Sequence, residues 1–174
     1  MRPVVPDPEL SFTALDFETA DSPSNSACAI GLTRVEQGKI VAQDSFLIRP
    51  PFPYVRFTRI HGITWDMVRD KPTFVERWPR IQQMIEGVDY LAAHNALFDR
   101  RVLHASCLAH GVRPPPQDFL CTVKLARRPW NLRRANLKAV CEMLEIPLQH
   151  HHAGSDAEAC ARIILAAQAV AQGG

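Results

Sequence analysis

The chain has 174 residues, of which 47% are hydrophobic and 22% charged, and its formal net charge is +2. This size and balance predict one soluble globular domain and exclude disordered and fibrous proteins. No apolar run approaches the length of a membrane-spanning helix, and the start MRPVVPDPEL lacks the apolar core of a signal peptide. Five scattered cysteines without a CxxC pair predict free thiols, so we expect a cytoplasmic protein with no membrane partner.

The first fifty residues predict strands. Three apolar, β-branched segments follow one another: FTALDF (12–17), ACAIGLTRV (27–35) and KIVAQDSFLI (39–48). The links between them are short, and Gly38 lies in the second link. We therefore expect an antiparallel meander within a domain that spans residues 10–172, after a short N-terminal extension, 1–9.

Helical periodicity begins at TFVERWPRIQQMIE (73–86). Its apolar residues recur at spacings of four, three and four, typical of one helix face, although Pro79 predicts a kink or break. YLAAHN (90–95) then predicts a short strand that leads into Asn95, a natural N-cap. The helix that follows is expected to stop at Gly111.

The last third of the chain alternates short apolar runs and helices. DFLCTV (118–123) is a short apolar run, and Leu137, Val140 and Leu144 predict a helix that ends before Pro147. A last helix is expected from Ser155, with Glu158 completing a capping box. Strands followed by alternating helix and strand predict an α/β fold, a mixed sheet covered by helices.

Two acids stand out at the end of the first predicted strand. Asp16 and Glu18 are two residues apart, so both side chains point to one face of the strand. If they are buried, their charges raise each other's pKa and call for a cation; at an exposed sheet edge, solvent would suffice. Asp99 and Asp156 lie in the first turns of predicted helices, where an acid also interacts favourably with the helix dipole. If all four converge, they form an oxygen-only site that suits Mg²⁺ or Mn²⁺.

Three consecutive histidines, 150–152, admit three interpretations: a metal cluster, a leftover tag, or a catalytic base with a partner acid. A tag is disfavoured because the run is internal and short. Zinc binding through all three is disfavoured because adjacent side chains do not easily face one ion. A histidine titrates near 6.5 when unperturbed, which suits a base at neutral pH.

The segment from Phe119 to Cys141 is strongly basic. It holds Trp130 and no acid, together with six basic residues: Lys124, Arg127, Arg128, Arg133, Arg134 and Lys138. Such a segment either grips a phosphate backbone or forms a solvated arginine-rich loop. Charge alone leaves both interpretations open.

Four short motifs resemble those of the DEDDh (DnaQ-like) 3′→5′ exonuclease family. They are DFET (16–19), RIHGIT (59–64), HNALFD (94–99), and His151 followed five residues later by Asp156. The family includes the epsilon proofreading subunit of bacterial DNA polymerase III and free-standing epsilon-like exonucleases. The resemblance implies a ribonuclease H-like α/β fold, with three antiparallel strands followed by parallel strands and helices on the faces.

The resemblance also assigns roles. It implies four ligands of two Mg²⁺ or Mn²⁺ ions, Asp16, Glu18, Asp99 and Asp156, with His151 as the general base. It places Phe17 and Thr19 in the terminal nucleotide's pocket, His61 and Ile63 against or between the last bases, and Asn95 and Phe98 near the scissile phosphate. In the histidine run, only His151 fits the family's H-x-A-x-x-D pattern, so His150 and His152 are expected to be ordinary loop residues.

The expected function is metal-dependent hydrolysis of nucleotides from the 3′ end of single-stranded nucleic acid, with DNA favoured over RNA. The alternatives are a polymerase-associated proofreading or nucleic-acid-binding accessory module, and an exoribonuclease. A homodimer and a contact with a polymerase stay open as partners. The chain departs from many family members at Ala20 and Asp21, where a threonine and a glycine are usual; Asp21 is expected to discourage a phosphate there.

Overall fold

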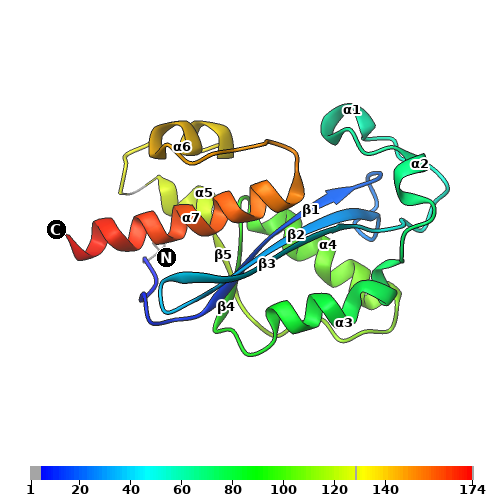
Figure 1. Cartoon of the computed structure of the whole chain (residues 1–174), viewed down its shortest axis with the longest axis horizontal. Coiled ribbons are helices and arrows are strands. Elements are labelled where there is room, and N and C mark those ends of the chain that lie inside the picture. Colours follow the sequence, from blue (N-terminus) through cyan, green and yellow to red (C-terminus); the bar gives the residue numbers. More distant parts are fainter. Residues whose placement is uncertain (1–4, 128, 174) are drawn as a thin grey trace.

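A five-stranded mixed sheet forms the centre of the computed structural model, with the strands in the order β3-β2-β1-β4-β5 (Figure 1). The structure describes residues 5–127 and 129–173, so Arg128, Gly174 and the first four residues of the expected extension lie outside it. β1 pairs antiparallel with β2 and parallel with β4, while β2–β3 is antiparallel and β4–β5 parallel. The ribonuclease H-like mixed sheet is thereby confirmed. Its strands are β1 (Phe12–Thr19), β2 (Ala27–Glu36), β3 (Lys39–Leu47), β4 (Tyr90–Ala93) and β5 (Phe119–Cys121).

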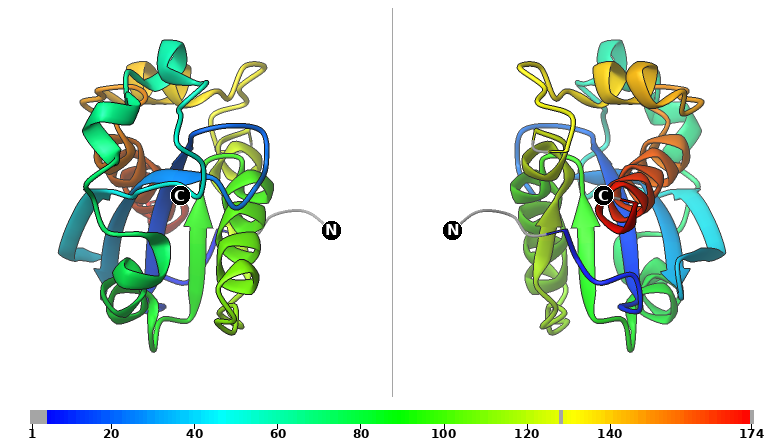
Figure 2. Two further views of the ribbon diagram at one scale, coloured as in Figure 1. Left: turned by 90° about the vertical axis from the view of Figure 1, so that its right-hand side faces the viewer. Right: turned by 90° about the vertical axis from the view of Figure 1, so that its left-hand side faces the viewer.

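Helices cover both faces of this sheet (Figure 2). Those that the sequence predicted are α3 (Phe74–Ile85), α4 (Ala96–Ala109), α6 (Leu137–Leu144) and α7 (Ala153–Gln172). Three short helices were not predicted: α1 (Thr58–His61), α2 (Trp65–Val68) and α5 (Thr122–Ala126). None of the helices within the described ranges is both long and apolar enough to cross a membrane.

Alternation along β1 decides which side chains meet which helices. Leu15 and Phe17 pack in the core cluster that also holds residues of α3 and α4. Phe12 and Ala14 point the other way and pack with residues of α7. Asp16 and Glu18 follow the period of Phe12 and Ala14. The two acids therefore end β1 on the face that α7 covers.

A glycine lets α7 come this close to the sheet. Gly31 of β2 is the register partner of Asp16 in β1. A Cβ atom at residue 31 would lie 2.0 Å from the carbonyl oxygen of Ala153, the first residue of α7. Only glycine therefore permits the backbone of α7 to rest on β2 at this point, one turn before Asp156.

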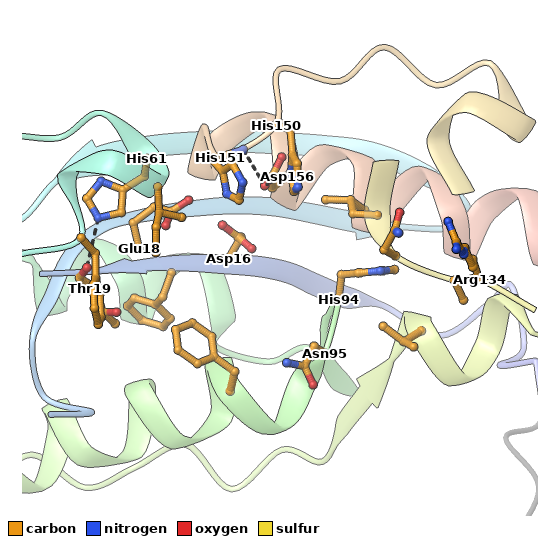
Figure 3. Close-up of a pocket in the computed structure, with 18 of the residues that line it drawn as sticks. Asp16, Glu18, Thr19, His61, His94, Asn95, Arg134, His150, His151 and Asp156 are labelled. Carbon is orange, nitrogen blue, oxygen red and sulfur yellow. Dashed lines mark hydrogen bonds and ion pairs between the residues drawn. The ribbon is translucent and has the colours of Figure 1, made fainter. Parts of the chain in front are cut away.

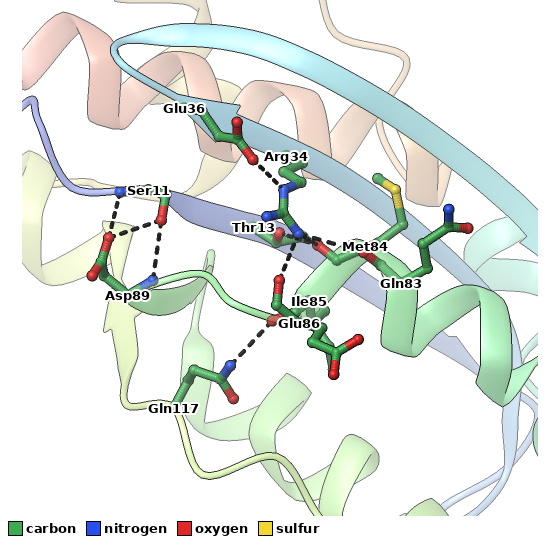
Figure 4. Close-up of polar contacts among 10 residues, drawn as sticks. All are labelled: Ser11, Thr13, Arg34, Glu36, Gln83, Met84, Ile85, Glu86, Asp89 and Gln117. Atoms are coloured by element: carbon green, nitrogen blue, oxygen red, sulfur yellow. Dashed lines mark hydrogen bonds and ion pairs between the residues drawn. The ribbon is translucent and has the colours of Figure 1, made fainter.

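The C-terminal end of α3 is fastened to the sheet by side chains (Figure 4). The carbonyl of Met84 accepts from the hydroxyl of Thr13 at 2.6 Å and from the guanidinium of Arg34 at 3.2 Å. The carbonyl of Ile85 accepts from the amide of Gln117 at 3.1 Å. The last carbonyls of a helix have no partner within it, so these donors satisfy groups that the end of α3 exposes.

The sequence predicted a kink or a break at Pro79, and the break is wrong, because α3 continues through that residue. Pro79 has no N–H to donate to the carbonyl of Val75. Because Val75 is 42% exposed, water can donate to that carbonyl instead. A capping box between Thr73 and Glu76 begins this helix.

The predicted capping box of the last helix is also wrong. α7 starts two residues before Ser155, and the side chain of its N-cap, His152, accepts from the Ser155 backbone N–H at 3.3 Å. The Ser155 hydroxyl accepts instead from the backbone N–H of Gln149 at 2.8 Å. Glu158 pairs with Arg162 one turn further on. His152 is therefore part of the helix start and not an ordinary loop residue.

Candidate active site

Carboxylates from two elements meet where β1 ends against the start of α7 (Figure 3). Asp16 and Glu18 of β1 and Asp156 of α7 each offer an oxygen, and these atoms lie within 4.8 Å of one another. The prediction that Asp16 and Glu18 share a face is confirmed. The alternative of an exposed sheet edge is wrong, because β1 is the central strand.

Asp99 approaches the same place from α4. It is only 1% exposed, and its Oδ1 accepts a hydrogen bond from the backbone N–H of Phe17 at 2.9 Å. It lies outside the group of three described above, yet its charge raises the pKa of Asp16 and of Glu18. All four acids thus belong to one electrostatic unit. Asn95, the residue before α4, holds φ at +73° and caps that helix without a side-chain hydrogen bond.

Burial and mutual repulsion make these acids reluctant to ionise without a cation. Burial, reinforced by Asp156 and Asp99, raises the pKa of Glu18 to about 8. Burial likewise raises the pKa of Asp99 to about 7 and lifts the pKa values of Asp16 and Asp156 above their ordinary range.

The donor set fits a hard divalent cation. Oδ1 of Asp156 is buried and has no hydrogen-bond partner among the described residues, so one carboxylate oxygen is left for a ligand. The atoms that Asp16, Glu18 and Asp156 offer are carboxylate oxygens, which suit Mg²⁺ and Mn²⁺, while His150 and His151 offer ring nitrogens to a second possible set with Asp156. A cation at this point would offset charges that the protein itself leaves uncompensated.

Two of the three histidines flank Asp156. His150 Nδ1 lies 3.1 Å from Asp156 Oδ2, and the backbone N–H of His151 donates to the same oxygen at 3.1 Å. The two imidazole rings stack with their centroids 3.9 Å apart. The backbone of His151 makes this possible with a φ of +65°, which is uncommon for a side-chain-bearing residue. Adjacent histidines can therefore face one site, contrary to expectation, and His150 is not an ordinary loop residue.

His61 closes one end of the site. Its Nδ1 accepts from the backbone N–H of Ile63 at 3.1 Å, so the proton lies on Nε2, which donates to the carbonyl of Thr19 at 3.1 Å. Burial lowers the pKa of His61 and favours this neutral form. The ring thus ties α1 to the end of β1, where Thr19 is 7% exposed.

Ile63 does not line the cleft that contains Asp16, Glu18 and His61. Its side chain is 7% exposed and packs in the cluster that contains Ala20 and Val68. Ile60 and Phe57, which the sequence analysis did not single out, line the cleft in its place, and Ile60 is 54% exposed. The left-handed Gly62, with φ +77°, reverses the chain between these residues and turns Ile63 inward.

Three of the acids, Asp16, Glu18 and Asp156, line one continuous cleft of about 840 Å³ together with His61 and Phe98, whereas Asp99 lies buried behind it. Phe17 also borders it, although this residue is 2% exposed and its ring belongs to the core; Phe98 is 40% exposed, and Asn95 lies beside it. Asp21 is not among the lining residues. It pairs with Arg56 at 3.3 Å, so its charge is balanced by a guanidinium group.

The basic segment forms the opposite end of the cleft from His61 (Figure 3). Arg127, Arg133 and Arg134 line it together with Asn136. Trp130 is partly buried and packs on two core clusters, so its ring anchors the segment instead of projecting toward solvent. Charge alone left open whether the basic segment grips a phosphate backbone or is a solvated loop. The position of these three arginines, at the same cleft as the acids, favours the first interpretation.

Comparisons with known proteins agree with this geometry. The RNase T family model, described as an exonuclease, matches residues 13–164. Exodeoxyribonuclease 10 of Escherichia coli is 36% identical over 124 residues, which are 68% of this chain and 50% of that protein. DNA polymerase III PolC-type of Thermotoga petrophila is 31% identical over 159 residues, 89% of this chain but only 12% of the polymerase. A solved structure, exonuclease X in complex with 5′ overhanging duplex DNA, superposes with a TM-score of 0.69 at 29% identity and 92% coverage of both chains.

Proposed function

Since the chain belongs to the RNase T exonuclease family, in its DEDDh branch, we propose that it removes nucleotides one at a time from the 3′ end of single-stranded nucleic acid, preferring DNA to RNA. The observation that carries the proposal is the meeting of Asp16, Glu18 and Asp156 within 4.8 Å, with His151 beside them. The chain spans half of the Escherichia coli relative and about an eighth of the polymerase, so activity and substrate are proposals for this protein.

The family implies dependence on a divalent metal. We assign Asp16, Glu18, Asp99 and Asp156 as the residues that would hold two Mg²⁺ or Mn²⁺ ions. When bound, such ions polarise a phosphoryl group, activate water and stabilise a leaving oxygen. Two observations support this assignment. The pKa values of all four acids are raised, and Oδ1 of Asp156 has no hydrogen-bond partner among the described residues.

His151 is the proposed general base. Its side chain is exposed at the cleft, and its backbone N–H is held by Asp156, so the imidazole is positioned beside the acids without being buried. It takes a proton from the water that attacks the scissile phosphorus. The bond from phosphorus to the 3′-oxygen of the preceding nucleotide breaks, and a nucleoside 5′-monophosphate leaves.

The His61 end of the cleft would hold the terminal nucleotide. Ile60 and Phe57 offer apolar surface to a base, and Phe98 borders the same space. Thr19 and His61 form a fixed wall, because the bond between them holds α1 to β1. Because Ile63 is buried, it would support this wall from the core and would not contact the bases itself.

Two relatives favour DNA as the substrate. One is named an exodeoxyribonuclease, and the exonuclease X structure contains duplex DNA with a 5′ overhang. The likeness to the PolC-type DNA polymerase supports a second candidate function, that of a proofreading module that contacts a polymerase. An exoribonuclease and a homodimer are further alternatives for the same site. All five cysteines are free, which is compatible with the reducing cytoplasm.

The test is a time course on DNA and RNA oligonucleotides labelled at the 5′ end, with Mg²⁺ or with EDTA. The proposal predicts a ladder that shortens from the 3′ end in Mg²⁺, faster on DNA, and no cleavage in EDTA or by Asp16→Asn. A few labelled products of scattered intermediate length, formed from the start and without a ladder, would indicate endonucleolytic cleavage and contradict it. Retention of intact strands on a native gel would instead indicate the accessory binding module.

A further inference from the structure

The arginine end of the cleft has a chemistry that the carboxylates do not explain. Arg127, Arg133 and Arg134 are exposed and border the same cleft as the acids. Within residues 5–127 and 129–173, none of the three forms an ion pair. Guanidinium groups that face a cleft without a carboxylate partner are suited to bind an external anion, above all a phosphate.

These arginines lie on a segment that the core holds in place. Trp130 packs against two core clusters, and Ala135 is 4% exposed. Asn136 is the N-cap of α6, and its side chain accepts from the Ala139 backbone N–H at 2.9 Å. Arg133 and Arg134 therefore stand between buried anchors at the rim of the cleft. A merely solvated loop would not need such anchors.

His94 lies at the same end of the cleft and is held there by the protein. Its Nδ1 lies 2.9 Å from the hydroxyl of Thr122, and its ring also makes a hydrogen bond to the backbone of Ala135. In Figure 3 the ring points away from Asp16 and toward Arg134. Since Ala135 directly follows Arg134, His94 supports the segment that carries the two arginines.

We propose that Arg133 and Arg134 bind the phosphates of the substrate strand on the 5′ side of the scissile bond. The inference rests on the proposed function and adds to it a preference for strands of several nucleotides over a single nucleotide ester. The same strand is the expected occupant because acids and arginines share one cleft, and phosphates recur along a strand. No second copy of the chain is needed, since the arginines reach the cleft of their own chain.

The experiment compares substrates that reach the arginines with one that does not. The p-nitrophenyl ester of thymidine 5′-phosphate fills only the terminal nucleotide's pocket and the carboxylate site. Single-stranded DNA from a dinucleotide to about ten nucleotides extends progressively further. The variant is Arg133→Gln with Arg134→Gln. Its charge-matched control is Arg101→Gln with Arg113→Gln, two exposed arginines outside the cleft that also form no ion pair among the described residues.

The wild type and the control should gain kcat/KM as the strand lengthens. The Arg133/Arg134 variant should lose most of that gain, about tenfold or more on the longest strands, while its hydrolysis of the ester is unchanged. The dependence of log KM on log salt concentration should also flatten, by about 0.7 for each phosphate that the variant no longer neutralises.

Three results would overturn the inference. Equal losses on the ester and on long strands would mean that the segment only shapes the active site. Unchanged kinetics on every substrate would return it to a solvated loop. A loss confined to duplexes with overhangs would assign the arginines to the complementary strand. If the wild type hydrolyses neither ester nor strand, the proposed function itself fails, which is a separate result.

Discussion

The backbone of Ala153 rests directly on Gly31: a Cβ atom at residue 31 would lie 2.0 Å from the Ala153 carbonyl oxygen. Gly31 faces Asp16 across the β1–β2 pair, and Asp156 lies three residues after Ala153. One contact therefore sets how closely α7 brings its acid to the acids of β1. The spacing of the site depends on the absence of a side chain at this position.

Gly31→Ala should accordingly damage activity more than its chemistry suggests. The added methyl group must displace the start of α7, at a cost of roughly 1–3 kcal/mol in the free energy of unfolding. A shift of about 1 Å at Asp156 can lower kcat by about 10²-fold. Urea unfolding and steady-state kinetics measure the two effects. Gly173→Ala is the control, because its Cβ would meet only an ordinary contact at 3.5 Å; an active, fully stable Gly31→Ala would refute the argument.

Mg²⁺ should stabilise the protein, and more strongly at pH 8 than at pH 6. Glu18 and Asp99 have pKa values of about 8 and about 7 when folded, above ordinary values near 4. Below pH 4 these groups are protonated in both states and cost nothing. As the pH rises to 8 the unfolded chain releases its protons first, so the metal-free folded state loses stability.

The measurement is the melting temperature in EDTA and in Mg²⁺ at both pH values. In EDTA it should be lower at pH 8 than at pH 6, and Mg²⁺ should close that gap. Asp99→Asn should reduce both the dependence on pH and the response to Mg²⁺, since the amide carries no charge. A melting temperature that does not respond to Mg²⁺ at pH 8 would argue against a cation site among these acids.

The two isoleucines of the RIHGIT motif should separate binding from stability. Ile60→Ala removes exposed surface from the cleft, so KM for DNA should rise several-fold while stability changes by no more than about 0.5 kcal/mol. Ile63→Ala should lower stability by roughly 2–5 kcal/mol, because its side chain is in the core. Chemical unfolding and KM for a short oligonucleotide distinguish them; the opposite pattern would place Ile63 against the substrate.

The site acids could be predicted because their positions follow from regular structure. The period of two places Asp16 and Glu18 together, while the family resemblance singled out Asp99 and Asp156, which the fold brings to the same end of β1. The central place of β1 also decided between solvent and a cation, which two residues alone could not do.

The remaining details depend on backbone conformation and tertiary packing. The stacking of His150 on His151 needs a positive φ at His151, which no local sequence signal announces. Ile60 faces the cleft where Ile63 was expected, because the chain turns at Gly62 after the single-turn helix α1. The basic segment borders the cleft because Trp130 packs against core residues that are distant in the sequence.

The comparison of His151→Gln with His150→Gln tests the account most directly, in steady-state hydrolysis of single-stranded DNA with Mg²⁺. Removing the proposed base should lower kcat by roughly 10²–10⁴-fold. Removing His150 loses one hydrogen bond to Asp156 and should cost less than about tenfold. Unchanged melting temperatures would show that both variants fold. The reverse order of the two losses, or full activity in both variants, would contradict the assignment of His151 as the base.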